Sequence, residues 1–383
     1  MATRALDRTA AAASTRLVSL DVFRGITMAA MVIVNNPGDW SNVYAPLLHA
    51  EWHGWTPTDL IFPFFLFIVG VSITLSRKST SWGSILRRAA IIFVLGLFLA
   101  GYPRFDLSTW RIPGVLQRIA ICYLIAAAVY KSLGAAPDPQ WSGNRARLAT
   151  ILATIAFGTC IGYWLIMTFA PAPGGVGDLS PEGNVGAWLD RALMEGHLWK
   201  PRWDPEGLLS TLPAIGTALF GVVAGLWIGS AESPQRKASG LLLGGAAGVA
   251  LGYVWNIVFP INKSLWTSSY VLFTAGAAAL FLALCYWTID VKGWKGWTKP
   301  FVILGMNAIT LYVVSGLLAE TLGLITVTGS SGREMSLGRY FFVEFLAPIA
   351  SPKNASLMYA FANLLVLSAL LAWMYRRKIF LRV

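Results

Sequence analysis

Ten apolar runs, each long enough to cross a lipid bilayer, dominate the sequence. A membrane-spanning helix needs roughly 20 consecutive apolar residues, because the hydrocarbon core is about 30 Å thick. The runs cover residues 18–36, 58–76, 84–101, 112–132, 146–170, 207–230, 237–259, 267–289, 300–323 and 356–376. Since a helix satisfies its own backbone hydrogen bonds in lipid, the sequence predicts an all-α polytopic membrane protein with about ten transmembrane helices.

The composition is typical of a membrane protein and indicates which partners to expect. Of the 383 residues, 56% are hydrophobic and 13% are charged, whereas soluble domains average roughly 25% charged residues. The net charge of +12 could indicate nucleic acid, but the basic residues concentrate in short loops. We therefore predict contact with membrane lipid and no nucleic-acid partner. Cys122, Cys160 and Cys285 lie inside apolar runs, which predicts packing residues and no disulfide or metal site.

Lysine and arginine predict the orientation. If the N-terminus is inside, 19 of the 30 basic residues fall on inner segments and nine on outer segments, while Arg24 and Arg118 lie within helices. Cytoplasmic loops carry the excess of positive charge, so both termini are expected in the cytoplasm. The first run is too long for a typical signal core and ends in "NNPGDW" without a small-x-small cleavage site, which favours a retained first helix. We expect a multi-pass protein of the cell inner membrane.

The whole chain, residues 1–383, is interpreted as one transmembrane domain with outer loops at 37–57, 171–206 and 324–355. In the second loop, "VGAWLDRALMEG" predicts a short helix lying in the membrane interface, with Trp188 and Leu193 on its apolar face. In the third, "LGRYFFVEFLAPIA" is apolar but too short to span. It is expected to act as an interfacial anchor or as a lid.

Scarce titratable groups gather in the first outer loop. The stretch "LLHAEWHGWTPTDLIFP", residues 47–63, holds His49 and His53, two of the three histidines, together with Asp59. Imidazole suits proton transfer near neutral pH, although a loop histidine can simply hydrogen-bond at the interface. The two histidines have the spacing of some metal pairs, but no third ligand cluster accompanies them, so no metal is predicted. His197 is expected to be a surface loop residue.

Six segments resemble a known family of membrane enzymes. They read "RLVSLDVFRGITMAAMVIVNN", "LHAEWHGWTPTDLIFPFFLFIVGVSI", "RIPGVLQRIAICY", "DPEGLLSTLPAIGTALFGVVAG", "FPINKSLWTSSYVLFTAG" and "GMNAITLYV", in this order between residues 16 and 313. Together they resemble the heparan-α-glucosaminide N-acetyltransferase family, including its bacterial NagX-like members. The chain departs from the lysosomal members in lacking their N-terminal luminal domain, in a longer loop from Asn35 to His49, and in His53, where they have asparagine.

The resemblance implies a reaction. Lysosomal members take the acetyl group of cytosolic acetyl-CoA and place it on a terminal glucosamine across the membrane. It therefore implies acetyl-CoA as co-substrate, an amino-sugar acceptor and no metal. The physiological acceptor stays open, because a bacterial-type chain has no heparan to modify, and homodimerisation is left open as well. His49 matches the family's catalytic histidine, and Asn35 matches a family asparagine.

Two more groups complete the catalytic hypothesis. Asp59 follows Thr56, Pro57 and Thr58, where a carboxylate stabilises the start of a helix. It can also orient His49 or bind the acceptor's ammonium, and the two interpretations are compatible. Asn35 can cap the end of the first helix, or donate a hydrogen bond to the thioester oxygen as charge develops there.

Three polar residues within helices are candidates for binding CoA. Arg118 is expected about six residues inside the fourth helix, where a charge is costly. Its partner could be Asp59, Glu320 or a phosphate. Arg24 either pairs with Asp21 three residues away or meets CoA phosphates entering from the cytosol. Asn307 is expected to line the same passage.

The outer helix mouths carry the candidates for acceptor binding. These are Glu206, Lys263, Asn262 and Trp52, although the first two can equally serve loop structure. The favoured function is an acetyl-CoA-dependent acetyltransferase with His49 as general base or as a transiently acetylated nucleophile. A transporter of amino sugars or cell-wall fragments, and an O-acetyltransferase of envelope polysaccharide, remain alternatives.

Overall fold

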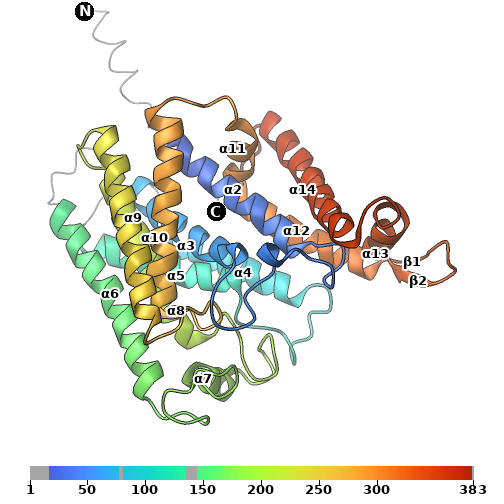
Figure 1. The fold of residues 1–383 in the computed structure, drawn as a ribbon, viewed down its shortest axis with the longest axis horizontal. Helices are drawn as coiled ribbons and strands as arrows, with labels where there is room; N and C mark the ends of the chain where they lie inside the picture. The colour runs from blue at the N-terminus through green and yellow to red at the C-terminus, as the bar shows by residue number, and fades with distance from the viewer. Residues whose placement is uncertain (1–16, 77–80, 135–144, 382–383) are drawn as a thin grey trace, which may run out of the picture.

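The computed structural model describes residues 17–76, 81–134 and 145–381. Its long helices are α2 (Val18–Asn35), α3 (Ile61–Leu75), α4 (Trp82–Gly101), α5 (Val115–Ser132), α6 (Arg145–Phe169), α8 (Leu208–Ile228), α9 (Pro234–Asn256), α10 (Ser268–Cys285) and α14 (Pro352–Arg376), shown in Figure 1. Shorter elements are α7 (Val185–Met194), α11 (Lys299–Met306), α12 (Ala308–Leu324), α13 (Leu337–Phe341) and the antiparallel strands β1 (Thr326–Thr328) and β2 (Glu334–Ser336). The predicted all-α class is confirmed, and the hairpin in the third outer loop is an addition to it.

Within the described residues, nine helices are long and apolar enough to cross a membrane, and the pair α11 and α12 makes a tenth span if it counts as one. The predicted run at 300–323 corresponds to this pair, but its continuity was wrong, because the two helices meet at an angle of 79°. The break falls at Asn307, whose backbone is not helical (φ −121°, ψ 40°). Its side-chain amide donates to the Ile379 carbonyl and its oxygen accepts from the Leu381 amide. The polar side chain thus binds the segment after α14 at the point where the helix bends.

The contacts at the two ends of α14 show its direction relative to α2. The start of α14 lies beside the end of α2, because the Gly38 amide donates to the Ser356 carbonyl and the Tyr44 hydroxyl to Asn354. At the other end, Leu381 lines one cavity together with Asp21 of α2. Helix α14 is therefore antiparallel to α2, and Figure 1 shows the two helices side by side. The two ends of the described chain lie on the same side.

We predict that this side is the cytoplasm. A reporter active only outside the membrane, fused to the C-terminus, should give no signal, because the 19-to-9 bias in basic residues holds that end inside. The same reporter inserted in the outer hairpin at Gly332 should be active. Reversed signals would move His49 to the cytosol and overturn the orientation. Six of the inner basic residues lie outside the described part of the chain: Arg4, Arg8, Arg16, Arg77, Lys78 and Arg382.

Close packing of glycines fixes α3 against α8. A Cβ atom on Gly70 would lie 1.9 Å from the Ala218 carbonyl oxygen, and one on Gly221 would lie 2.1 Å from that of Phe67. Small residues at such positions let helix backbones approach closely in a membrane. This contact holds α3, which directly follows the turn that carries Asp59, against α8.

Candidate active site

Asp59 stands in a short 3₁₀ turn, Pro57–Leu60, directly before α3. One carboxylate oxygen accepts hydrogen bonds from the backbone amides of Thr56 at 2.9 Å and Ala50 at 3.0 Å. The residue is 1% exposed. These bonds form a capping box with Thr56, so the helix-start interpretation holds. They also fix the carboxylate for a second contact.

That second contact is to His49. The other Asp59 oxygen lies 2.6 Å from His49 Nδ1. Because a carboxylate only accepts hydrogen bonds, Nδ1 carries the hydrogen, and Nε2 keeps its lone pair. Lys263 Nζ lies 3.0 Å from both ring nitrogens and 3.9 Å from the carboxylate oxygen. An atom equally near both nitrogens sits over the ring rather than in line with either lone pair.

Lys263 belongs to the loop between α9 and α10. The loop is held by the fully buried Asn262, whose amide donates to the Thr267 hydroxyl and whose side-chain oxygen accepts from the Leu265 amide. Burial lowers the pKa of Lys263, while the negative charges of Glu206 and Asp59 act in the opposite direction. Asn262 uses these atoms to shape the loop that carries Lys263, and its role in substrate binding stays a prediction.

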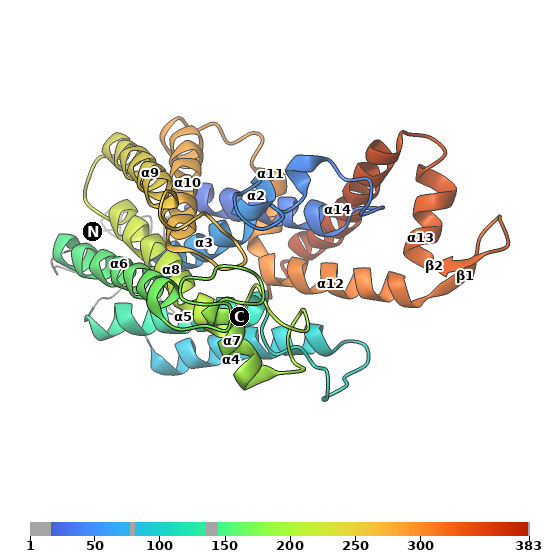
Figure 2. The same cartoon turned by 60° about the horizontal axis from the view of Figure 1, so that its bottom comes forward.

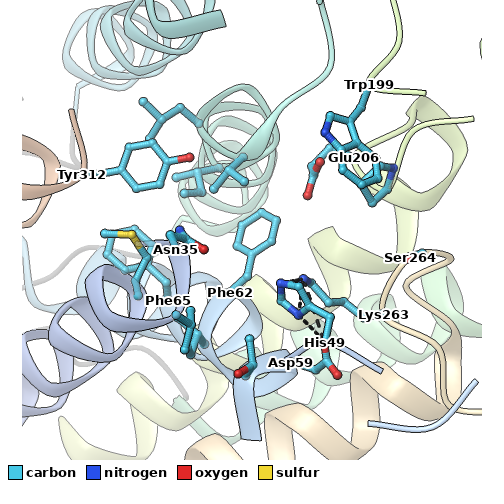
Figure 3. A pocket seen from close by; sticks show the side chains of 18 of the residues that line it. Asn35, His49, Asp59, Phe62, Phe65, Trp199, Glu206, Lys263, Ser264 and Tyr312 are labelled. Carbon is cyan, nitrogen blue, oxygen red and sulfur yellow. Dashed lines mark hydrogen bonds and ion pairs between the residues drawn. The ribbon is translucent and has the colours of Figure 1, made fainter. Parts of the chain in front are cut away.

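The cluster opens into an outer cavity of about 450 Å³. Figure 3 shows His49, Asp59 and Lys263 on one side of this cavity, with Asn35, Glu206 and Tyr312 facing them. Five predicted residues line it with His49: Asn35, Asp59, Trp52, Glu206 and Lys263. The structure thus brings together most of the catalytic and acceptor-binding candidates, from four separate segments of the chain.

Sequence reasoning missed the ion-pair network at the rim. The Arg111 guanidinium binds Asp204 through two hydrogen bonds of 2.8 and 2.7 Å and reaches Glu206 at 2.5 Å. Glu206 is therefore partly neutralised where it faces the cavity. The carboxylates raise the pKa of Arg111 above its usual value, against the effect of burial. A signal existed, because Arg111 opens the "RIPGVLQR" motif and Asp204 opens "DPEG".

A wall of tryptophans was also missed in part. Trp203 packs edge-on against Trp52 and Trp199, with ring centroids 5.2 and 5.6 Å apart. The Trp52 indole donates to the Leu179 carbonyl at 2.9 Å. All three rings line the outer cavity. Aromatic faces near carboxylates attract a ligand that carries a cation.

A second cavity, of about 390 Å³, lies near the start of α2 and the end of α3, and we call it the inner cavity. Arg24 lines it and donates to Ser72 at 2.8 Å, while its ion pair with Asp21 spans 3.3 Å. Arg88 lines it as well, with its guanidinium 4.8 Å from the centre of the Tyr123 ring. The inner and outer cavities share five lining residues: Phe65, Leu116, Ile119, Ala308 and Ile309. These five apolar side chains, which we call the neck, therefore lie between the two cavities.

Arg118 lies elsewhere. It is the fourth residue of α5, not about the sixth, because the chain before Val115 is extended at Gly114 (φ 172°). Its guanidinium donates to the Gly207 carbonyl and the Ser210 hydroxyl and stacks on Trp266 at 5.1 Å. Neither Asp59 nor Glu320, the two carboxylates considered as partners, pairs with it among the described residues. A role in binding CoA remains a prediction.

Three other polar residues hold loops and ends. Asn307 binds the segment after α14, and its side chain does not line the inner cavity, although its neighbours Met306 and Ala308 do. His53 Nδ1 lies 3.4 Å from Asn262, and burial lowers its pKa. His197 Nδ1 lies 2.8 Å from the Trp110 carbonyl oxygen, which fixes a surface loop.

Fold and site together define a polytopic membrane protein with a histidine–carboxylate–lysine centre that lines a cavity at one end of the helix bundle. The sequence pattern of the family described as "Heparan-alpha-glucosaminide N-acetyltransferase, catalytic" matches residues 16–172. The chain is 34% identical to the human heparan-alpha-glucosaminide N-acetyltransferase over 353 residues, covering 78% of this chain and 52% of that protein. It is 32% identical to the mouse protein over 362 residues, covering 78% and 53%.

The chain therefore belongs to the heparan-alpha-glucosaminide N-acetyltransferase family. It spans about half the length of the curated relatives it matches. The matched segment 16–172 includes Asn35, His49 and Asp59.

Proposed function

We propose that this protein transfers the acetyl group of acetyl-CoA to the amine of a glucosamine-type sugar at the outer face of the cell inner membrane. The observation that carries the proposal is the His49–Asp59 pair, placed in an outer cavity that shares lining residues with an arginine-lined inner cavity. The names of the relatives supply the reaction type, N-acetyl transfer.

The two cavities suit a long ligand with a charged head. Arg24 and Arg88 at the inner cavity would meet the phosphates of CoA, since arginine forms charge-assisted hydrogen bonds with phosphate. The thin arm of CoA would pass the neck, whose lining is apolar. The thioester would then reach the outer cavity, where Asn35 can donate a hydrogen bond to its carbonyl oxygen.

The outer residues fit the chemistry of amide formation. The amine nitrogen attacks the thioester carbonyl carbon, a carbon–nitrogen bond forms, and the carbon–sulfur bond breaks. His49 Nε2 accepts the proton that leaves the nitrogen and returns it to the sulfur of CoA. Asp59 holds the ring through Nδ1. In the second mechanism, Nε2 attacks the thioester first and the acetyl group passes from histidine to the amine.

The acceptor would bind at the tryptophan wall. Trp52, Trp199 and Trp203 offer aromatic faces, and Glu206 a carboxylate, toward the same cavity. Such a set suits an amino sugar, whose amine arrives as an ammonium and must lose a proton before it reacts.

A product assay tests this function. Purified protein incubated with acetyl-CoA and glucosamine should release free CoA and form N-acetylglucosamine, detected by mass spectrometry. Alkaline hydroxylamine should leave the product intact, because it cleaves esters and spares amides. A hydroxylamine-sensitive product would indicate an O-acetyltransferase. The absence of any acetylated product, amide or ester, would favour a transporter.

We predict that Arg24→Gln weakens CoA binding by at least about tenfold, because a charge-assisted hydrogen bond contributes roughly 1.5–3 kcal/mol. Acceptor affinity should change little, since Arg24 lines the inner cavity only. Titration calorimetry with CoA measures the effect, and Arg376→Gln, an exposed basic residue on the same side, is the control. Unchanged CoA affinity in Arg24→Gln would assign Arg24 to a structural pair with Asp21.

A further inference from the structure

A third cavity, of about 910 Å³, lies apart from the two described above and shares no lining residue with either. Helices α6 and α9 form its walls, and α8 and α10 form its floor. Figure 2 shows α8 between α6 and α9. This groove is lined by, among others, Ala149 and Phe157 of α6, Phe220 and Trp227 of α8, and Gly244 and Leu251 of α9.

The groove faces the lipid. In the spans of α6 and α9, only 28% and 22% of the residues are buried, so these helices lie at the periphery of the bundle. Gly244 contributes open space to the groove, since a Cβ atom added there would meet no other atom within 4 Å. The volume is in the range of about 300–1,000 Å³ that is typical of ligand pockets.

One end of the groove is polar and carries a net positive charge. Arg145, Ser230 and Glu232 line it where α6 begins and α8 ends. Arg145 donates to the Gly229 carbonyl at 2.7 Å and lies close enough to Lys237 for the two like charges to repel each other. Glu232 pairs with Arg236 at 3.0 Å. Three cations and one carboxylate leave a local excess of two positive charges.

The polar end of the groove lies on the predicted cytoplasmic side. Helix α6 starts, and α8 ends, on the same side of the molecule as the start of α2, which is the predicted cytoplasmic side. Basic pockets between transmembrane helices on that side bind anionic lipid headgroups. We propose that the groove binds one anionic phospholipid of the inner leaflet, with its phosphate at Arg145, near the charge of Lys237, and its acyl chains along α9. This site is independent of the proposed acetyl transfer.

Native mass spectrometry of the detergent-purified protein tests the proposal, with phosphatidylglycerol and phosphatidylcholine as probes. The wild type should retain one phosphatidylglycerol and prefer it to phosphatidylcholine. Gly244→Phe should lose the lipid, because a Cβ atom added at Gly244 has open space around it and the ring then occupies the groove. Gly162→Phe is the matched control: it also lies in a peripheral helix with open space at Cβ, outside the groove, and should keep the lipid.

The charge at the headgroup end has its own variants. Arg145→Gln and Lys237→Gln should each weaken phosphatidylglycerol binding about fivefold, the effect of one cation near a membrane surface. Phosphatidylcholine binding should weaken less, because its choline cation makes the headgroup net neutral. Retention of lipid by Gly244→Phe at the wild-type level would overturn the proposal. So would a Gly244→Phe protein that changes from dimer to monomer without losing lipid, because the groove would then seat a second copy of the chain.

Discussion

Replacement of His49 by alanine is expected to lower acetyl transfer by about 10²–10⁴-fold, the usual contribution of a general base. The reason lies in the geometry around the ring. Asp59 holds Nδ1 at 2.6 Å, which leaves Nε2 as the atom available to take a proton from the amine. The imidazole side chain is half exposed at the cavity mouth, so its removal leaves no void in the helix packing. Folding and CoA binding should be retained.

Product formation at saturating acetyl-CoA and glucosamine measures this effect in purified variants. His53→Ala is the control, since His53 is near Asn262 and does not line the outer cavity. Its loss should be small. Asp59→Asn should fall between the two, because it keeps the shape of the side chain and removes the charge that orients the imidazole. If His49→Ala keeps more than about a tenth of wild-type turnover, the loss is less than about tenfold. That is far smaller than the 10²–10⁴-fold contribution of a general base and would exclude this mechanism.

The second large effect is expected at Arg111, and it concerns stability. The Asp204 side chain is completely buried and its charge is balanced by Arg111. Arg111→Met should lower the free energy of unfolding by about 3–5 kcal/mol, because removal of one partner leaves a buried charge without compensation. The variant should melt at a lower temperature in detergent. The melting temperature is measured from the fluorescence of the protein that stays soluble after heating.

A double-mutant cycle separates the ion pair from simple packing. Arg111→Met combined with Asp204→Asn should recover part of the loss, because the uncompensated charge is removed as well. The exposed pair of Arg202 and Glu182, with side chains 67% and 56% exposed, provides the comparison, since surface ion pairs contribute about 0–1 kcal/mol. Equal melting temperatures of Arg111→Met and Arg202→Met would contradict the assignment.

The helices were predictable because lipid leaves few alternatives to a helix. Nine of the ten apolar runs correspond to a described span within a few residues, and the tenth corresponds to the bent pair α11 and α12. A contact of Asp59 with His49 was one of the roles predicted for that carboxylate. The bend at Asn307 was not predictable, since the run around it is apolar on both sides and the cause is a tertiary contact with Ile379 and Leu381. The local sequence around Asn307 does not indicate these partners, because they belong to the segment that follows α14.

The site was predictable in its titratable groups and not in its supporting contacts. The short motifs around His49, Glu206 and Lys263 indicated polar groups at helix mouths. That Lys263 lies over the His49 ring depends on how the loop after α9 folds around Asn262. The contacts of Arg118 with Gly207 and Ser210 were not predicted either. Spacing along one helix does not reveal the helix that packs against it.

The neck between the inner and outer cavities has a consequence for the membrane itself. A passage that reaches both faces of a bilayer would dissipate ion and proton gradients if water filled it. The neck is lined by Phe65, Leu116, Ile119, Ala308 and Ile309, which offer no polar side chain. A hydrophobic constriction excludes water and blocks ion flow by dewetting. These five side chains would therefore act as electrical insulation between the two cavities.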